Sequence, residues 1–362
     1  MIGKKQITFA DLLQQRSWTD YTQFISEAPL LYSQEVIQHV QEERELIRQI
    51  QKHPDFKRLD IYQVDKRLAE AGELLGNGLV VGVDGTVSRY RLFSGLRCQI
   101  GVVAVNYMGD KIRHSFYVSE ANIRENPEDA IERVAGRIIF EDSLSEMAIR
   151  GLMLYRERQA GLDKKFENSY VMFHGPLLPF ELMSGLGRLR ALEATLDILR
   201  NVVRQKRFFS IVSSTAYQDY LTFGRAISPG EYLTTSSYTL ARHLLNSSGF
   251  MSYQDKWRED ERKTVEEFLG DYADRIMIGV IRVAERPYVF HAHKDVFHLA
   301  AAIIAKDAMF QKEKGFPLLI DYADSLCSQY FSSSEFKAMI EWELAKQGAY
   351  LSEAPEQDLR LK

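Results

Sequence analysis

The sequence predicts an α/β protein in which helices flank a mixed β-sheet and a helical arm precedes that sheet. Three observations predict this fold class. Apolar, β-branched runs separated by short breaks follow one another between residues 79 and 118, as in a meander of antiparallel strands. A long helical segment and alternating strand-like and helical segments come next. Residues 1–75, in contrast, have apolar residues at helical spacing within a polar stretch.

The composition is that of an ordinary globular protein. Its 362 residues are 45% hydrophobic, with a net charge of -4 and two distant cysteines, Cys98 and Cys327. No stretch reaches the roughly 18 uninterrupted apolar residues of a membrane span, and no apolar signal segment follows the first lysines. We therefore expect a cytoplasmic, reduced protein without a membrane span. Any nucleic acid would have to bind a local basic surface.

The chain divides into three predicted parts. Residues 1–75 form an N-terminal helical arm, which either coils against a partner or covers the main domain. Residues 76–350 form the main domain, and residues 351–362 form a loose tail. The expected strands are 80–83, 90–93, 100–107, 112–117, 170–173, 208–212, 276–283 and 288–291, and the expected helices are 126–158, 180–205, 296–305 and those after 317.

The order of these elements is informative. Meandering strands, a long helix, then strand, helix and strand is the order of an RNase H-like sheet with helices on both faces. In this order, Asp84 ends the first apolar run and is followed by Gly85. A carboxylate at a strand end beside a glycine is a common way to hold a divalent cation, although Asp-Gly is also a frequent turn dipeptide.

Four short motifs resemble the NurA nucleases. Residues 83–86 resemble the family's opening Val-Asp-Gly-Ser, and 137–141 resemble the Arg-x-x-x-Glu of its long helix. Residues 172–177 resemble its apolar strand ending in Asp-Gly-Ser/Pro-Leu, and 315–324 resemble the segment that opens its last catalytic helix. Each motif alone is unspecific. The resemblance rests on the order of the four motifs over residues 79–345.

The resemblance implies an RNase H-like DNA nuclease, with exonuclease and single-strand endonuclease activity. It also implies a homodimer that works beside a HerA-like hexameric, DNA-translocating ATPase in DNA end processing or antiphage defence. Two divalent cations about 3.5–4 Å apart can activate water and stabilise the leaving oxygen in such a hydrolysis.

Carboxylates from separate elements would hold those cations. We assign Asp84 as the bridging ligand and Asp324 as a ligand of one metal. The helix ligand is either Glu141, which fits the Arg-x-x-x-Glu spacing, or Glu146. These two lie about 140° apart around a helix, so only one of them can point into a small site.

His174 is the main departure from the family pattern, because an acid is expected there. A neutral imidazole can ligate a transition metal but removes one negative charge, so we expect Mn²⁺ to be used and Mg²⁺ to bind less well. The alternative is a histidine that only hydrogen-bonds a neighbouring backbone. If the substitution ends catalysis, the chain is instead a nuclease-derived docking subunit that regulates the ATPase.

Three further groups have two interpretations each. His291, His293 and His298 suggest either a zinc site or a surface turn rich in polar rings. The alternation of basic and aromatic residues in 89–93 suits a half-buried strand or a contact with single-stranded DNA. Arg204, Lys206 and Arg207 either contact phosphate or end a solvated helix.

Overall fold

The computed structural model describes residues 21–92, 95–119, 142–186, 191–213, 217–235, 237–253 and 256–348. Contacts divide the chain into two units, residues 1–57 and residues 58–362. In the first unit, α2 (Tyr21–Lys52) is a single long helix with Pro29 inside it. This division differs from the predicted boundary at residue 75, because β1 and α3 make their contacts in the second unit.

The described residues of the second unit form one nine-stranded sheet in the order β1-β7-β8-β9-β6-β5-β2-β3-β4. Two pairs, β2 with β5 and β5 with β6, are parallel, and the other pairs are antiparallel. The strands are β1 (Asp60–Gln63), β2 (Val80–Leu92), β3 (Gly95–Val105), β4 (Lys111–Ser119), β5 (Tyr170–His174), β6 (Phe208–Val212), β7 (Glu231–Thr234), β8 (Ile276–Arg282) and β9 (Pro287–His293).

The part of the sheet ordered β4-β3-β2-β5-β6 is an antiparallel meander joined to two parallel strands. This is the RNase H-like order that the sequence predicts, so the predicted fold class is confirmed. The remaining strands β9, β8, β7 and β1 extend the sheet by antiparallel pairing. Of these, β8 and β9 are predicted and β1 and β7 are not.

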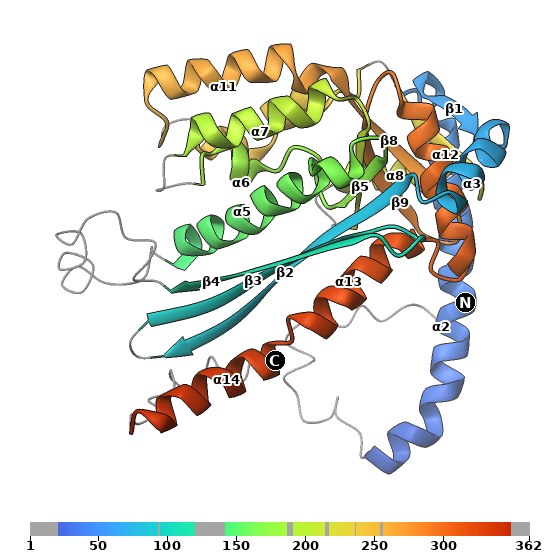
Figure 1. The fold of residues 1–362 in the computed structure, drawn as a ribbon. Helices are drawn as coiled ribbons and strands as arrows, with labels where there is room; N and C mark the ends of the chain where they lie inside the picture. Colours follow the sequence, from blue (N-terminus) through green and yellow to red (C-terminus); the bar gives the residue numbers. More distant parts are fainter. Residues whose placement is uncertain are drawn as a thin grey trace. The chain divides into compact units, whose positions relative to one another are not determined.

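Helices cover both faces of the sheet (Figure 1). They are α3 (Leu68–Gly76), α5 (Asp142–Gly161), α6 (Phe180–Met183), α7 (Leu192–Arg204), α8 (Gln218–Gly224), α9 (Leu240–Leu245), α10 (Ser248–Tyr253), α11 (Glu259–Asp271), α12 (Phe297–Ala308), α13 (Leu318–Tyr330) and α14 (Ser333–Lys346). The start of the predicted helix 126–158 lies outside the described residues. The predicted helix 180–205 is two helices, because the backbone at Gly185 and Leu186 has positive φ.

Two glycines of β2 allow helices to approach it from opposite faces. A Cβ at Gly82 would lie 2.7 Å from the Leu319 carbonyl oxygen of α13, and a Cβ at Gly85 would lie 2.7 Å from Glu157 Oε1 of α5. Residues an odd number apart on a strand face opposite ways. The central strand is thus held between α13 and α5 (Figure 1).

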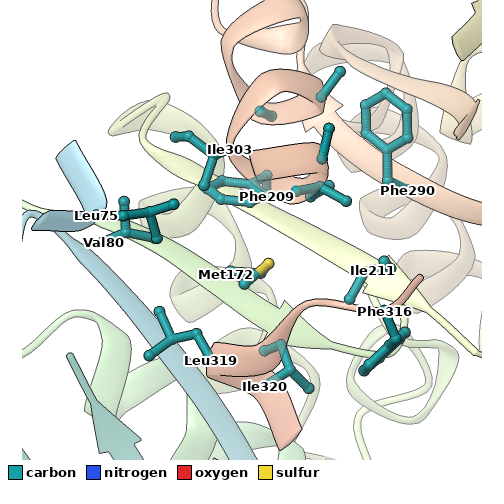
Figure 2. Close-up of a cluster of buried hydrophobic side chains, with 14 of the residues drawn as sticks. Leu75, Val80, Met172, Phe209, Ile211, Phe290, Ile303, Phe316, Leu319 and Ile320 are labelled. Carbon is teal, nitrogen blue, oxygen red and sulfur yellow. The ribbon is translucent and has the colours of Figure 1, made fainter. Parts of the chain in front are cut away.

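One core cluster lies between the sheet and helices α3, α12 and α13. Val80, Met172, Phe209, Ile211 and Phe290 line this face of successive strands (Figure 2). Because residues 80–83 of β2, residues 171–173 of β5 and all of β6 are buried on both faces, their sequences are continuous apolar runs, which is why these segments can be predicted. No helix within the described ranges has the length and apolar character needed to cross a membrane.

Candidate active site where β2 and β5 separate

Asp84 lies within β2 and not at its end. The parallel pairing of β2 with β5 ends at Val83, but the antiparallel pairing with β3 continues to Leu92. The predicted strand end and turn at Gly85 are therefore wrong. Asp84 is buried, and its Oδ1 accepts a hydrogen bond from the Gly85 backbone N–H at 2.9 Å. The parallel pairing of β2 with β5 ends one residue before Asp84, so Asp84 follows the last paired residue.

His174 is the last residue of β5 and lies next to Asp84. Its Nδ1 is 3.4 Å from Asp84 Oδ1, and its Nε2 is 2.9 Å from the hydroxyl of Ser213, which follows β6. Burial alone lowers the pKa of His174, but the contact with Asp84 and the charges of Asp84, Glu157 and Asp324 together raise it above its usual value. The imidazole is thus surrounded by carboxylates, and both its nitrogens have side-chain neighbours.

Glu157 supplies the helix carboxylate of this cluster. It lies on α5 with 1% of its surface exposed, and its Oε1 faces the backbone of Gly85, next to Asp84. Burial raises the pKa of Glu157, the charge of Arg158 opposes this, and the charge of Asp84 adds to it. Glu157 and Asp84 therefore interact directly through their charges.

The predicted helix ligands are placed differently. Glu141 lies outside the described residues, and Glu146 belongs to α5 but precedes Glu157 by eleven residues, about 16 Å along a helix. Sequence reasoning missed Glu157. A signal was present, because Glu157 and Arg158 stand three and four residues after Leu154, on the face that α5 buries. A Glu-Arg pair on a buried helix face is unusual unless it has a role.

Arg158 holds this arrangement together and is itself fully buried. It donates to Glu157 Oε2 at 2.6 Å and to the carbonyl oxygens of Pro176 at 2.5 Å and Leu177 at 3.4 Å. Its guanidinium also lies over the ring of Phe173, 4.5 Å from the centroid. One side chain thus fixes the helix carboxylate and the loop that follows His174.

Asp324 reaches the same cluster from α13. It is exposed, and its pKa is raised by partial burial and then by the charge of Asp84, while the charge of His174 opposes the rise. The helix is anchored on β2 three residues later, where the Cys327 thiol donates to the Asp84 carbonyl oxygen at 3.3 Å. The charges of Asp84 and Asp324 therefore interact in the fold, although the two residues are 240 residues apart in sequence.

The donor set has the chemistry of a transition-metal site, since carboxylates with an imidazole suit Mn²⁺. The side-chain geometry is less complete: in the part of the chain that the structure describes, no group of three His, Cys, Asp or Glu side chains is arranged to hold a metal ion. His174 instead faces Asp84 and Ser213. The residues therefore fit a metal by the chemistry of their donor atoms, and Asp84 and His174 lie 3.4 Å apart.

The predicted zinc alternative is not supported by the structure. His291 and His293 do share a face of β9, but both are buried, so the surface-turn interpretation is also wrong for them. Burial lowers the pKa of His291 to about 3, so this ring is neutral. His298 instead contacts the Tyr232 hydroxyl through Nδ1 at 2.7 Å.

The basic residues 204–207 lie away from the site. Arg207 immediately precedes β6, whereas Ser213 follows the other end of that strand. Arg207 donates to the carbonyl oxygens of Phe166 and Ser169, which is a structural role. Two other cations lie closer to the site: the Arg286 guanidinium donates to the Ser213 carbonyl oxygen at 3.2 Å, and the charge of Lys314 lowers the pKa of Asp324. Residues 89–92 belong to β2, as the strand interpretation predicts.

No protein-family model and no curated protein sequence matches the chain. Among solved structures, the NurA nuclease from Sulfolobus solfataricus is similar at 9% identity and a TM-score of 0.43, covering 78% of this chain and 95% of that one. NurA with manganese has 10% identity and a TM-score of 0.41, covering 77% and 92%. NurA bound to dAMP and manganese has 12% identity and a TM-score of 0.42, covering 76% and 93%.

These matches agree with the predicted resemblance in fold alone.

Proposed function

We propose that this chain is a metal-dependent phosphodiester hydrolase that cuts DNA. The observation that supports the proposal is the gathering of Asp84, Glu157, His174 and Asp324 from four separate elements around the point where β2 and β5 separate. Buried or half-buried carboxylates are costly to place together in a folded protein. Their convergence beside an exposed helix acid is typical of a site that uses the resulting negative potential.

Mn²⁺ is the cation that this donor set favours, with Mg²⁺ as the weaker fit. Asp84, Glu157, His174 and Asp324 would hold it, and Glu141 or Glu146 remains the alternative to Glu157. When bound, such a cation makes a water more acidic and stabilises the charge that develops on the phosphate. In the reaction, water adds to phosphorus, one P–O bond to a sugar breaks, and the leaving sugar oxygen takes up a proton.

The chain's own residues have separate roles in this proposal. Arg158 fixes Oε2 of Glu157, so that Oε1 stays directed at β2. Arg286 is exposed beside the His174–Ser213 contact and is placed to bind a phosphate of the strand. Lys314 is a second candidate for a phosphate contact, since its charge already acts on Asp324.

A second candidate function is a docking subunit that no longer cuts DNA and regulates an ATPase. Its support is the absence, within the described ranges, of a three-ligand group, together with the histidine at position 174. In both cases we propose a HerA-like hexameric ATPase as the partner and a homodimer as the working form, with end processing or antiphage defence as the setting.

The deciding experiment is digestion of linear single- and double-stranded DNA by the purified chain with Mn²⁺, with Mg²⁺ and with EDTA. We expect cleavage with Mn²⁺, and we expect Asp84→Ala to abolish it. Glu193→Gln is the control, because Glu193 is an exposed acid on α7 whose carboxylate pairs with Arg200.

His174→Asp separates the two functions. Cleavage by the natural chain supports the nuclease. Cleavage only after His174→Asp supports the docking subunit with a substituted site, and no cleavage by either protein, alone or with the ATPase, contradicts the nuclease and the site assignment.

A further inference from the structure

A second concave site is lined by aromatic rings and shares no residue with the candidate active site. Its volume is about 480 Å³, within the usual range for small-molecule pockets. The lining comes from α8, from the segment before α9 and from α9 itself. Tyr217 is buried and forms the floor, while Tyr220, Tyr238 and His243 are half-buried and form the walls.

The rings are arranged as a connected aromatic surface. Tyr217 and His243 stack with centroids 4.4 Å apart and planes 20° apart. Tyr220 meets His243 edge-on at 5.6 Å, and Tyr238 meets Tyr220 edge-on at 4.6 Å. Such a surface favours a flat, aromatic ligand, which can stack on one ring face and meet another edge-on.

The rim has the polar groups that a heteroaromatic edge requires. Gln218 and Asn246 are exposed amides at the mouth, and each offers both a donor and an acceptor. Paired amide groups are the side chains that recognise the edges of nucleobases. The charged groups at the mouth are Asp219 and Arg242, one of each sign, so the pocket suits a neutral ring that has at most one phosphate near Arg242.

The pocket is connected to the candidate active site through the sheet. The Tyr217 ring meets the buried His291 ring at 5.3 Å, and His291 Nδ1 accepts from the Leu177 backbone N–H, three residues after His174. The strand register places His174 opposite Ile211 and Ile211 opposite Phe290, next to His291. Because successive residues of a strand face opposite ways, His291 lies on the face of the sheet opposite to Phe290, so this link runs through the sheet.

We propose that this aromatic pocket, formed by Tyr217, Tyr220, Tyr238, His243, Gln218 and Asn246, binds a nucleobase. The base belongs either to an unpaired nucleotide of a DNA strand that passes the candidate active site or to a free nucleotide. The first source rests on the proposed nuclease function, and the pocket itself does not. Base binding here would hold a single strand in register and favour substrates that have unpaired nucleotides.

The test is binding in EDTA, where cleavage does not interfere. The probes are a fluorescein-labelled (dT)20 strand, followed by anisotropy, and free dTMP, followed by calorimetry. Tyr238→Leu and Tyr220→Leu each remove one ring, and we expect each to weaken strand binding by a factor of about 5 to 150, the range contributed by one base–aromatic stack. Gln218→Ala with Asn246→Ala changes only exposed rim residues and should weaken binding without affecting folding.

The matched control is Tyr155→Leu. Tyr155 is also half-buried and lines a surface depression of about 550 Å³, but no other ring lines that depression. Near-UV circular dichroism and the thermal midpoint of each variant show whether it is folded. Loss of (dT)20 binding alone assigns the pocket to a strand, and parallel loss of dTMP binding assigns it to a free nucleotide.

Three results would overturn the proposal: unchanged affinity in the folded rim and ring variants, an equal loss in Tyr155→Leu, or no binding of either probe by the natural chain. A strand containing 4-thiothymidine gives an independent readout, since its photo-crosslinks should map to α8 or to residues 237–247. Cleavage with Mn²⁺ is measured separately. Binding without cleavage contradicts only the nuclease, and cleavage with pocket variants of unchanged affinity contradicts only the pocket.

Discussion

Asp307 and Glu157 are both buried carboxylates, but they have different neighbours. This difference distinguishes a structural role from a proposed chemical one. Asp307 of α12 is fully buried, and its two oxygens accept from neutral donors, the Tyr107 hydroxyl at 2.5 Å and the Leu319 backbone N–H at 2.9 Å. Glu157 is equally buried, but one of its oxygens accepts from the Arg158 guanidinium and the other faces the backbone beside Asp84.

Burial raises the pKa of both groups, so a raised pKa does not by itself mark a reactive group. The neighbours make the difference. Asp307 joins α12 to the start of α13 and to the loop after β3, and its hydrogen bonds are complete. Glu157 shares its surroundings with Asp84 and His174, whose charges all depend on one another. We therefore assign Asp307 to holding α13 in place and Glu157 to the chemistry.

The largest effect expected is on cleavage. Glu157→Gln keeps the size of the side chain and an acceptor for Arg158 but removes the charge, so we expect the rate of DNA cleavage with Mn²⁺ to fall at least about a hundredfold. Asp307→Asn, an equally conservative change of a buried acid, should leave the rate within a fewfold of the natural chain. Both rates are measured on the same linear substrate, at a temperature at which both variants are folded.

Equal losses in the two variants would mean that Glu157 acts only through folding. A full rate in Glu157→Gln, with a loss in Glu141→Gln or Glu146→Gln, would move the helix ligand to the position predicted from the sequence.

The next effect is on stability. Arg158→Met leaves Glu157 buried beside Asp84 without its cation, and we expect a loss of about 3–5 kcal/mol in the free energy of unfolding. Adding Glu157→Leu removes the stranded charge, and the double variant should recover most of that loss. Urea unfolding of the two single variants and the double variant measures the coupling between the two side chains. Additive losses would show that Arg158 acts through the Pro176 and Leu177 carbonyl groups instead.

A pH effect follows from Asp307. Burial raises the pKa of Asp307 from 3.8 to about 6, so the folded chain holds more protons than the unfolded chain between these pH values. Stability therefore falls as pH rises from about 4 to about 6 and stays lower above that range, by on the order of 3 kcal/mol. Asp307→Asn cannot ionise, and its free energy of unfolding should lack this slope. An identical slope in the natural chain and in Asp307→Asn would assign the titration to another group.

The comparison also shows which parts of the structure can be predicted from the sequence alone. Strands β5, β6, β8 and β9 are predicted to within a few residues, because each is a buried apolar run. The four residues of β1 are all exposed, and this strand exists through its pairing with β7. It therefore has no apolar pattern to detect.

The residues of the candidate site can likewise be predicted only where the local sequence has a recognisable pattern. Asp84 could be predicted, because an acid directly after the apolar run 79–83 is conspicuous. Glu157 has a weaker signal, its place beside Arg158 and three residues after Leu154, because its burial depends on Gly85, which allows α5 to approach β2. The aromatic pocket could not be predicted from the sequence, since its rings come from segments about 25 residues apart that meet only in the fold.

The smallest expected effect concerns Asp307, the carboxylate with the structural role. Tyr107→Phe removes one neutral donor from Asp307 and keeps the ring, so we expect a loss of about 1 kcal/mol at neutral pH, typical of a single hydrogen bond. Because that hydroxyl stabilises the ionised carboxylate, its removal should raise the pKa of Asp307 further and move the pH-dependent loss of stability to higher pH. Unfolding of Tyr107→Phe and the natural chain, compared across pH 4 to 8, measures both quantities. Cleavage should be unchanged, since Leu319 still donates to Asp307 and α13 keeps Asp324 in place. A rate that fell together with the small loss of stability would show that the two carboxylates are coupled through α13.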